Sequence, residues 1–214
     1  VTGVQTCALP IYPLQLLPPE DPRVLATVDY LQQASWVHGA FFQNMVHSGL
    51  NAYLTLHVAQ VLLRAGRPEF QEAVQAVVDL ASPTGQWPEA IHPRTHGGCM
   101  GDGQHVWAAA EFVVMLRNMF VRHEDQTLIL GSGIFPEWLQ PGAVLRFGPA
   151  PTPFGPISLE VEAQAEQVTL SWSAEWREPP AILRTALPQT DARTPEPHDR
   201  SEERRVGKEC ATGC

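Results

Sequence analysis

The residues that could do chemistry are concentrated in one segment, Gly85–Phe112, with the sequence GQWPEAIHPRTHGGCMGDGQHVWAAAEF. It holds two carboxylates, Glu89 and Asp102, together with tryptophan and histidine side chains that a hydrophobic core does not require. A carboxylate held in such a segment can act as a general acid or base. Several glycines lie among these residues, and they allow a loop to fold back and a ligand to approach the backbone. We therefore expect an ordered polar loop between helices, where functional side chains are often displayed.

Two helices are predicted before this segment. Asp21 and Pro22 match an N-cap followed by proline at the first helical position, and the helix runs to about Gln33. Leu50–Ala65 is apolar on nearly every side, which is typical of a buried helix. Its polar residues form one narrow stripe at helical spacing: Tyr53, His57, Gln60 and Arg64.

The next helices suggest a repeated arrangement. Glu69–Ala81 is amphipathic, and the short turn around Gly66 makes it the outer member of an αα-hairpin. After the polar loop a third buried helix is expected over Gly103–His123, with Asp102 placed to cap it. This order of inner helix, outer helix, loop and inner helix suits a closed ring of hairpins with its loops at one mouth.

The pattern changes near Asp125, where apolar and polar residues begin to alternate at period two. Glycine and proline punctuate the alternating runs as turns. We expect a small antiparallel β domain with strands at Thr127–Leu130, Ala143–Phe147, Ile157–Glu162, Val168–Trp172 and Ile182–Leu187.

Both ends of the chain differ from the rest. Val1–Ile11 and Arg200–Cys210 resemble in-frame translations of two adapter oligonucleotides used in DNA sequencing, so they are left out of the fold prediction. We therefore expect a piece of a longer protein, and the sequence does not indicate its cellular compartment. The expected parts are an adapter-derived 1–12, helical hairpins over 13–124, a β domain over 125–188, disorder over 189–199 and an adapter-derived 200–214.

Charge and cysteine content narrow the possible partners. The formal net charge is −9, and residues 12–199 contain ten arginines and no lysine against twenty acidic residues. An acidic chain without a basic patch argues against nucleic acid as a partner. No apolar run reaches the length of about 18 residues that a membrane span requires. Outside the suspect ends Cys99 is the lone cysteine, so no intrachain disulfide demands an oxidising compartment.

Three stretches together resemble the late hairpins of the six-hairpin (α/α)6-barrel glycosidases, in the branch of the trehalases and processing glucosidases. They are GLNAYLTLHVAQVLLRAG, GQWPEAIHP and GDGQHVWAAAEF. The motif order of that branch is found at Trp87, Glu89, Pro93, Thr95, Gly97, Gly101–Gly103 and Ala108–Ala110. The resemblance implies an α+β chain, with an incomplete (α/α)6 barrel followed by a small antiparallel β domain. His92 and His96 depart from the expected motif.

The resemblance places Glu89 at the position of the general base. It implies hydrolysis of O-glycosidic bonds, with inversion and without a cofactor, and a general acid upstream of this chain. Inverting enzymes hold their two carboxyl groups about 6.5–9.5 Å apart, with room for the attacking water. Trp87 would offer a flat apolar face on which a pyranose could stack. The alternative is that Glu89 is a loop residue that binds backbone amides or an arginine.

Other polar residues of this region are candidates for binding sugar hydroxyls: His47, His92, Arg94, Asp102 and His105. Asp102 has the alternative role of helix cap, and Trp107 is interpreted as a core residue. His92, His96 and Cys99 have a metal-like spacing, but structural zinc takes four ligands, so we predict no metal site and a buried Cys99. Glu111 lies in an apolar helix and needs a partner such as Arg64, Arg94 or Arg117.

The sequence thus predicts part of a glycosidase with a carbohydrate substrate and Glu89 as base, and this chain alone is expected to be inactive. Two alternatives stay open. A glycoside phosphorylase on the same barrel would need a basic cradle for phosphate, for which only Arg94 is evident. A non-catalytic carbohydrate-binding or scaffold protein would leave Glu89 in solvent, away from any cleft. The sequence does not determine the sugar, the linkage, the identity of the general acid, retention or inversion at the anomeric carbon, or the oligomeric state.

Overall fold

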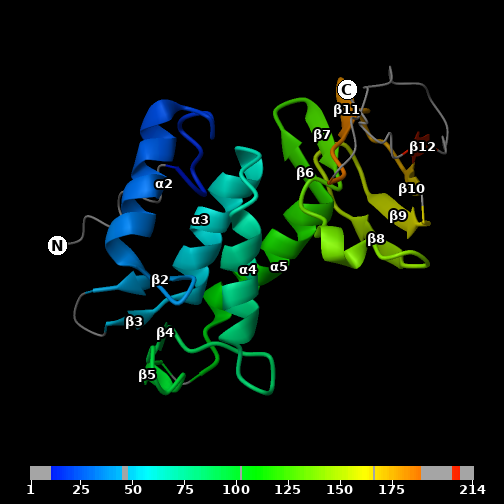
Figure 1. The fold of residues 1–214 in the computed structure, drawn as a ribbon. Coiled ribbons are helices and arrows are strands. Elements are labelled where there is room, and N and C mark those ends of the chain that lie inside the picture. The colour runs from blue at the N-terminus through cyan, green and yellow to red at the C-terminus, as the bar shows by residue number, and fades with distance from the viewer. Residues whose placement is uncertain (1–10, 45–47, 102, 166, 189–203, 208–214) are drawn as a thin grey trace, which may run out of the picture. The chain divides into compact units, whose positions relative to one another are not determined.

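The computed structural model describes residues 11–44, 48–101, 103–165, 167–188 and 204–207 (Figure 1). The chain divides into two compact units, Val1–Leu116 and Arg117–Cys214. Helices and antiparallel sheets are both present, which confirms the α+β class. The predicted disorder over 189–199 and most of the two adapter-like ends lie outside the described residues. Within the described part no helix is both long and apolar enough to cross a membrane.

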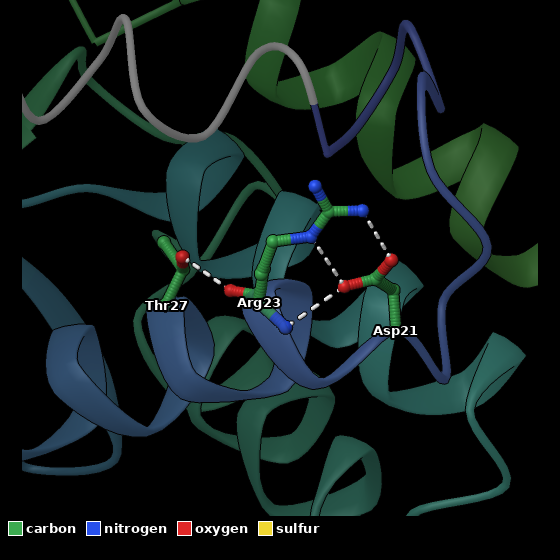
Figure 2. Close-up of polar contacts among 3 residues, drawn as sticks. All are labelled: Asp21, Arg23 and Thr27. Atoms are coloured by element: carbon green, nitrogen blue, oxygen red, sulfur yellow. Dashed lines mark hydrogen bonds and ion pairs between the residues drawn. The ribbon is translucent and has the colours of Figure 1, made fainter.

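The first helix, α2 (Pro22–Ser35), begins where the sequence predicts, at Asp21. The Asp21 carboxylate accepts hydrogen bonds from the backbone N–H and the guanidinium of Arg23, as Figure 2 shows. One turn later the Thr27 hydroxyl donates to the Arg23 carbonyl at 2.7 Å. The helix packs inward through Val24, Val28 and Leu31. An N-cap of this kind satisfies an amide that would otherwise have no partner within the helix.

The buried helix is α3 (Ala52–Arg64), and it lies beside the outer helix α4 (Phe70–Asp79) (Figure 1). Every residue from Ala52 to Leu63 is buried, as the sequence predicts for a helix that is apolar all round. The helix ends in a Schellman motif, in which Arg67 N–H donates to Leu62 O at 2.8 Å while Gly66 has φ +68°. This turn reverses the chain into α4 and forms the predicted αα-hairpin.

Five short strands form an antiparallel sheet in unit 1: β1 (Trp36–Val37), β2 (Ala40–Gln43), β3 (Gly49–Leu50), β4 (Ala90–Ile91) and β5 (Gly98–Met100). The aromatic stretch after α2 has no clear period, yet it forms β1 and β2. His38 and Gly39 turn the chain between them with φ values of +52° and +79°. Positive φ at both central residues is typical of the type I′ turns that join antiparallel strands. The sheet brings the Glu89 loop beside the start of α3.

The last helix differs from the expectation. It is α5 (Val106–Phe120), shorter at both ends than the predicted Gly103–His123. It is also not buried on all sides, because Val106 is 78 % exposed and Val113 is 66 % exposed. An apolar helix is buried on all sides only where neighbouring elements cover every face. Among the described residues, one side of α5 has no such cover.

Unit 2 contains two sheets. One has the order β11-β7-β6, and the other has the order β12-β10-β9-β8. Contrary to an all-antiparallel expectation, β11 runs parallel to β7. Arg204–Gly207, within the end taken to be adapter-derived, pairs with β10 as strand β12. The bounds are β6 (Val121–Glu124), β7 (Thr127–Leu130), β8 (Val144–Ala150), β9 (Ile157–Ala163), β10 (Gln167–Ala174), β11 (Ile182–Thr185) and the 3-10 helix η1 (Pro136–Trp138).

The period-two pattern places one face of these strands in a core. On β9 the buried residues are Ile157, Leu159, Val161 and Ala163, while Ser158, Glu160 and Glu162 face away. Arg146 on β8 forms an ion pair with Glu160 on the outer face, with its Nε 2.8 Å from Oε2. The alternation therefore selects the core residues of this unit, as the sequence indicates.

The N-cap of α2 makes a testable contribution to stability. The Arg23 guanidinium, followed by the Arg23 backbone N–H, lowers the pKa of Asp21 from 3.8 to about 2. Because the folded pKa lies below the unfolded value, this contribution is present above about pH 4 and is lost as the pH falls toward 2. We expect Asp21→Asn, which keeps a capping oxygen, to lack this part of the acid dependence. Urea unfolding followed by helical circular dichroism at several acidic pH values measures it. The same acid dependence in both proteins would contradict this role of Asp21.

Candidate functional site

The backbone at Glu89 is held by the start of α3. Glu89 lies half-buried just before β4, and its carbonyl oxygen accepts a hydrogen bond from Asn51 Nδ2 at 3.1 Å. The same Asn51 side chain caps α3, because its Oδ1 accepts from the Leu54 N–H at 3.0 Å. Asn51 is completely buried. A single buried amide thus fixes the candidate base to the most buried helix of unit 1.

Trp87 anchors the same loop from the other side. The residue is 5 % exposed, its Nε1 donates to Val77 O at 2.8 Å, and its ring packs against Phe112. Its carbonyl accepts the backbone N–H of His105 at 2.8 Å, which joins the loop to the residue just before α5. The predicted stacking of a pyranose on Trp87 does not fit this placement, because both faces of a ring this buried are covered.

Two glycines allow the strand β5 to pass close to Glu89. A Cβ atom at Gly101 would lie 3.3 Å from Glu89 N, and Gly101 has φ +81°. A Cβ atom at Gly98 would lie 3.1 Å from Pro88 Cβ. These separations are tighter than ordinary contacts, so the glycines of this loop are needed for close approach, as their density in the sequence indicates.

The histidines of the loop have local partners. His92 Nδ1 accepts hydrogen bonds from the backbone N–H groups of Arg94 and Thr95, each at 3.2 Å. His96 has φ +55°, and its N–H donates to His92 O at 2.9 Å. His92 therefore stabilises a tight turn, and Arg94 is displayed on its exposed side.

Cysteine and metal-ligand candidates are placed as follows. Cys99 is exposed on β5, so the prediction of a buried cysteine is wrong. β5 is the edge strand of the five-stranded sheet, and Cys99 is exposed there. Across the residues that the structure describes, no group of three His, Cys, Asp or Glu side chains is arranged to hold an ion. His47 and Asp102, both predicted to bind substrate, lie outside the described residues.

A second cluster, which the sequence prediction missed, joins α3 to α5. Glu111 does not depend on the expected arginine: its Oε1 lies 3.1 Å from His57 Nε2 and accepts from Trp107 Nε1 at 3.2 Å. His57 is 1 % exposed. Tyr53 stacks on Trp107 with ring centroids 4.3 Å apart. The polar stripe of α3 contained the signal, since Tyr53 and His57 are one turn apart on it.

Comparison with known proteins gives limited information. No protein-family model matches the chain, and no curated protein matches it. Among solved structures, one described as "Glycosidase Wild Type" aligns with TM-score 0.42 and 18 % identity, over 53 % of this chain and 34 % of that chain. Another, "Glycosidase E335A in complex with glucose", aligns with TM-score 0.39 and 18 % identity, over 50 % of this chain and 33 % of that one. The alignment thus spans about a third of those structures, and at these scores it identifies no family.

Asn51 provides a test of how the site is built. Asn51→Ala removes both the cap of α3 and the donor to Glu89 O, so we expect a loss of about 2–4 kcal/mol in the free energy of unfolding. Asn44→Ala, at an exposed position of the same unit, is the matched control and should stay within about 0.5 kcal/mol of the parent chain. Urea denaturation measures both. An Asn51→Ala variant as stable as the control would show that this amide does not hold the loop.

Proposed function

We propose that this chain is part of a glycoside hydrolase that cleaves O-glycosidic bonds with inversion, and that Glu89 is its general base. The observation that carries the proposal is the construction around Glu89. A half-buried carboxylate follows an anchored indole, and its backbone is tied to a buried helix by Asn51. A base needs such support because it must stay within hydrogen-bond reach of one water molecule.

The helical unit supports a place in an (α/α)6 barrel. A fully buried α3 and an amphipathic α4 make an inner and an outer helix, and the Glu89 loop then returns the chain to α5. In such a ring the loops at one mouth present the catalytic groups. The candidate base occupies a loop of this kind, in the order that the sequence motif predicts.

The proposed reaction needs a second carboxyl group. Glu89 accepts a proton from the attacking water, while a general acid upstream of this chain protonates the leaving oxygen on the opposite face of the sugar ring. The water then adds to the anomeric carbon as the glycosidic bond breaks. No cofactor takes part in this chemistry. Arg94 is the one arginine or lysine between α4 and α5, and it lies exposed in the turn after β4. The absence of a basic cradle in this segment favours water over phosphate as the nucleophile.

Substitution of the proposed base tests the function. Glu89→Gln in the full-length parent enzyme keeps the size of the side chain but cannot accept the proton, so turnover should fall at least about 100-fold. Glu72→Gln, at an exposed position in the first turn of α4, is the control and should retain turnover. Steady-state hydrolysis of glycosides by the two variants decides the point. Near-normal turnover in Glu89→Gln would remove Glu89 from the mechanism and favour a non-catalytic carbohydrate-binding protein.

A further inference from the structure

Of the two tryptophans in the Gly85–Phe112 segment, the exposed one is Trp107, on the first turn of α5. It is 44 % exposed, whereas Trp87 is 5 % exposed. The sequence indicates an accessible Trp87 and a core Trp107, whereas in the structure Trp87 is buried and Trp107 is exposed. We propose, building on the proposed glycosidase function, that Trp107 is the platform on which a pyranose ring of the carbohydrate substrate stacks.

The ring of Trp107 is held in a fixed orientation. Tyr53, which is 2 % exposed, stacks behind it with an interplanar angle of 23° and centroids 4.3 Å apart. At its edge Nε1 donates to Glu111 Oε1 at 3.2 Å. An aromatic ring with one face supported and its polar atom already satisfied loses little freedom on binding, which favours ligand affinity.

The carboxylate that orients the indole is itself held from below. Glu111 Oε1 lies 3.1 Å from Nε2 of His57, a residue that is 1 % exposed in α3. The Tyr12 ring packs edge-on against His57, with centroids 5.2 Å apart. The exposed Trp107 ring is therefore linked through Glu111 and His57 to the buried core of unit 1. Val106 and Val113, on the same helix, are more exposed and have no such support.

Two polar atoms of the same cluster have no hydrogen-bond partner among the described residues. They are His105 Nδ1 and Glu111 Oε2, and both atoms are buried. The His105 ring also lies against Tyr53, at 5.0 Å between centroids. A sugar presents an apolar ring face bordered by hydroxyl groups that donate and accept. The exposed aromatic face of Trp107 complements the apolar face of such a ring.

Trp107 and Glu89 lie in the same region of unit 1. The backbone N–H of His105 donates to Trp87 O at 2.8 Å. Trp107 follows His105 by two residues, and Glu89 follows Trp87 by two residues. Chain geometry then limits the separation of the Trp107 and Glu89 Cα atoms to roughly 20 Å at most. The two residues are therefore close enough for one extended oligosaccharide to reach both.

The experiment uses the whole chain labelled with 5-fluorotryptophan, titrated with D-glucose, D-mannose, D-galactose and maltose and observed by fluorine NMR. Glycerol serves as a polyol without a ring. The Trp107 resonance is assigned from Trp107→Phe, and it should shift with a sugar while the Trp87 resonance does not. Trp107→Ala should raise the dissociation constant about tenfold or more, and Trp107→Phe should raise it less, because phenylalanine keeps a smaller aromatic face. Val106→Ala, at the neighbouring exposed position, should leave the constant unchanged.

Two results would overturn the platform: equal sugar affinity in Trp107→Ala and the parent chain, or no binding of any of the four sugars by the parent chain. Helical circular dichroism checks that Trp107→Ala is folded, and the affinity of the more conservative Trp107→Phe gives an independent reading. The proposed function is judged separately. Glu89→Gln should bind sugar as the parent chain does and lose turnover in the full-length enzyme. Loss of sugar affinity in Trp107→Ala together with full turnover in Glu89→Gln would keep the platform and reject the base.

Discussion

One buried side chain, Asn51, organises the helical unit. Its amide oxygen caps α3 and its amide nitrogen donates to the carbonyl of Glu89, 38 residues further along the chain. A buried amide without partners costs about 1–3 kcal/mol, so the contact with the loop also stabilises the start of α3. The strands β3 and β4 pair immediately beside this link. The position of Glu89 is therefore a property of the helix start and the loop in combination.

The two tryptophans of the site have different physical roles. Trp87 is an anchor, since its indole N–H satisfies a carbonyl of α4 and its ring fills the space beside α5. Trp107 is a displayed surface, since Tyr53 and Glu111 fix the ring without covering it. The same residue type is thus a buried anchor of the loop at Trp87 and an exposed, fixed ring at Trp107. Proximity to a carboxylate in sequence is a poor guide to which role a tryptophan has.

Local signals predict much of the fold. The all-round apolar pattern identifies α3, Gly66 marks its end, and the period-two runs place β7, β8, β9 and β10. The pattern fails where burial depends on distant neighbours. The apolar residues of α5 suggest a buried helix, but one side of it is exposed. The sequence does not indicate the β1–β2 hairpin, because His38–Gly39 lacks the asparagine or aspartate that usually signals such a turn.

The sequence by itself determined the helical hairpin, the glycine-rich loop and the choice of Glu89 as the candidate base. These depend on residue periodicity, turn chemistry and motif order, all of which are local along the chain. Only the tertiary structure decided that Asn51 holds Glu89, that His57 meets Glu111, and that Trp107 is the exposed indole. Each of these joins residues from separate elements. Such contacts form only when helices and loops pack together, so the spacing of residues within one segment does not predict them.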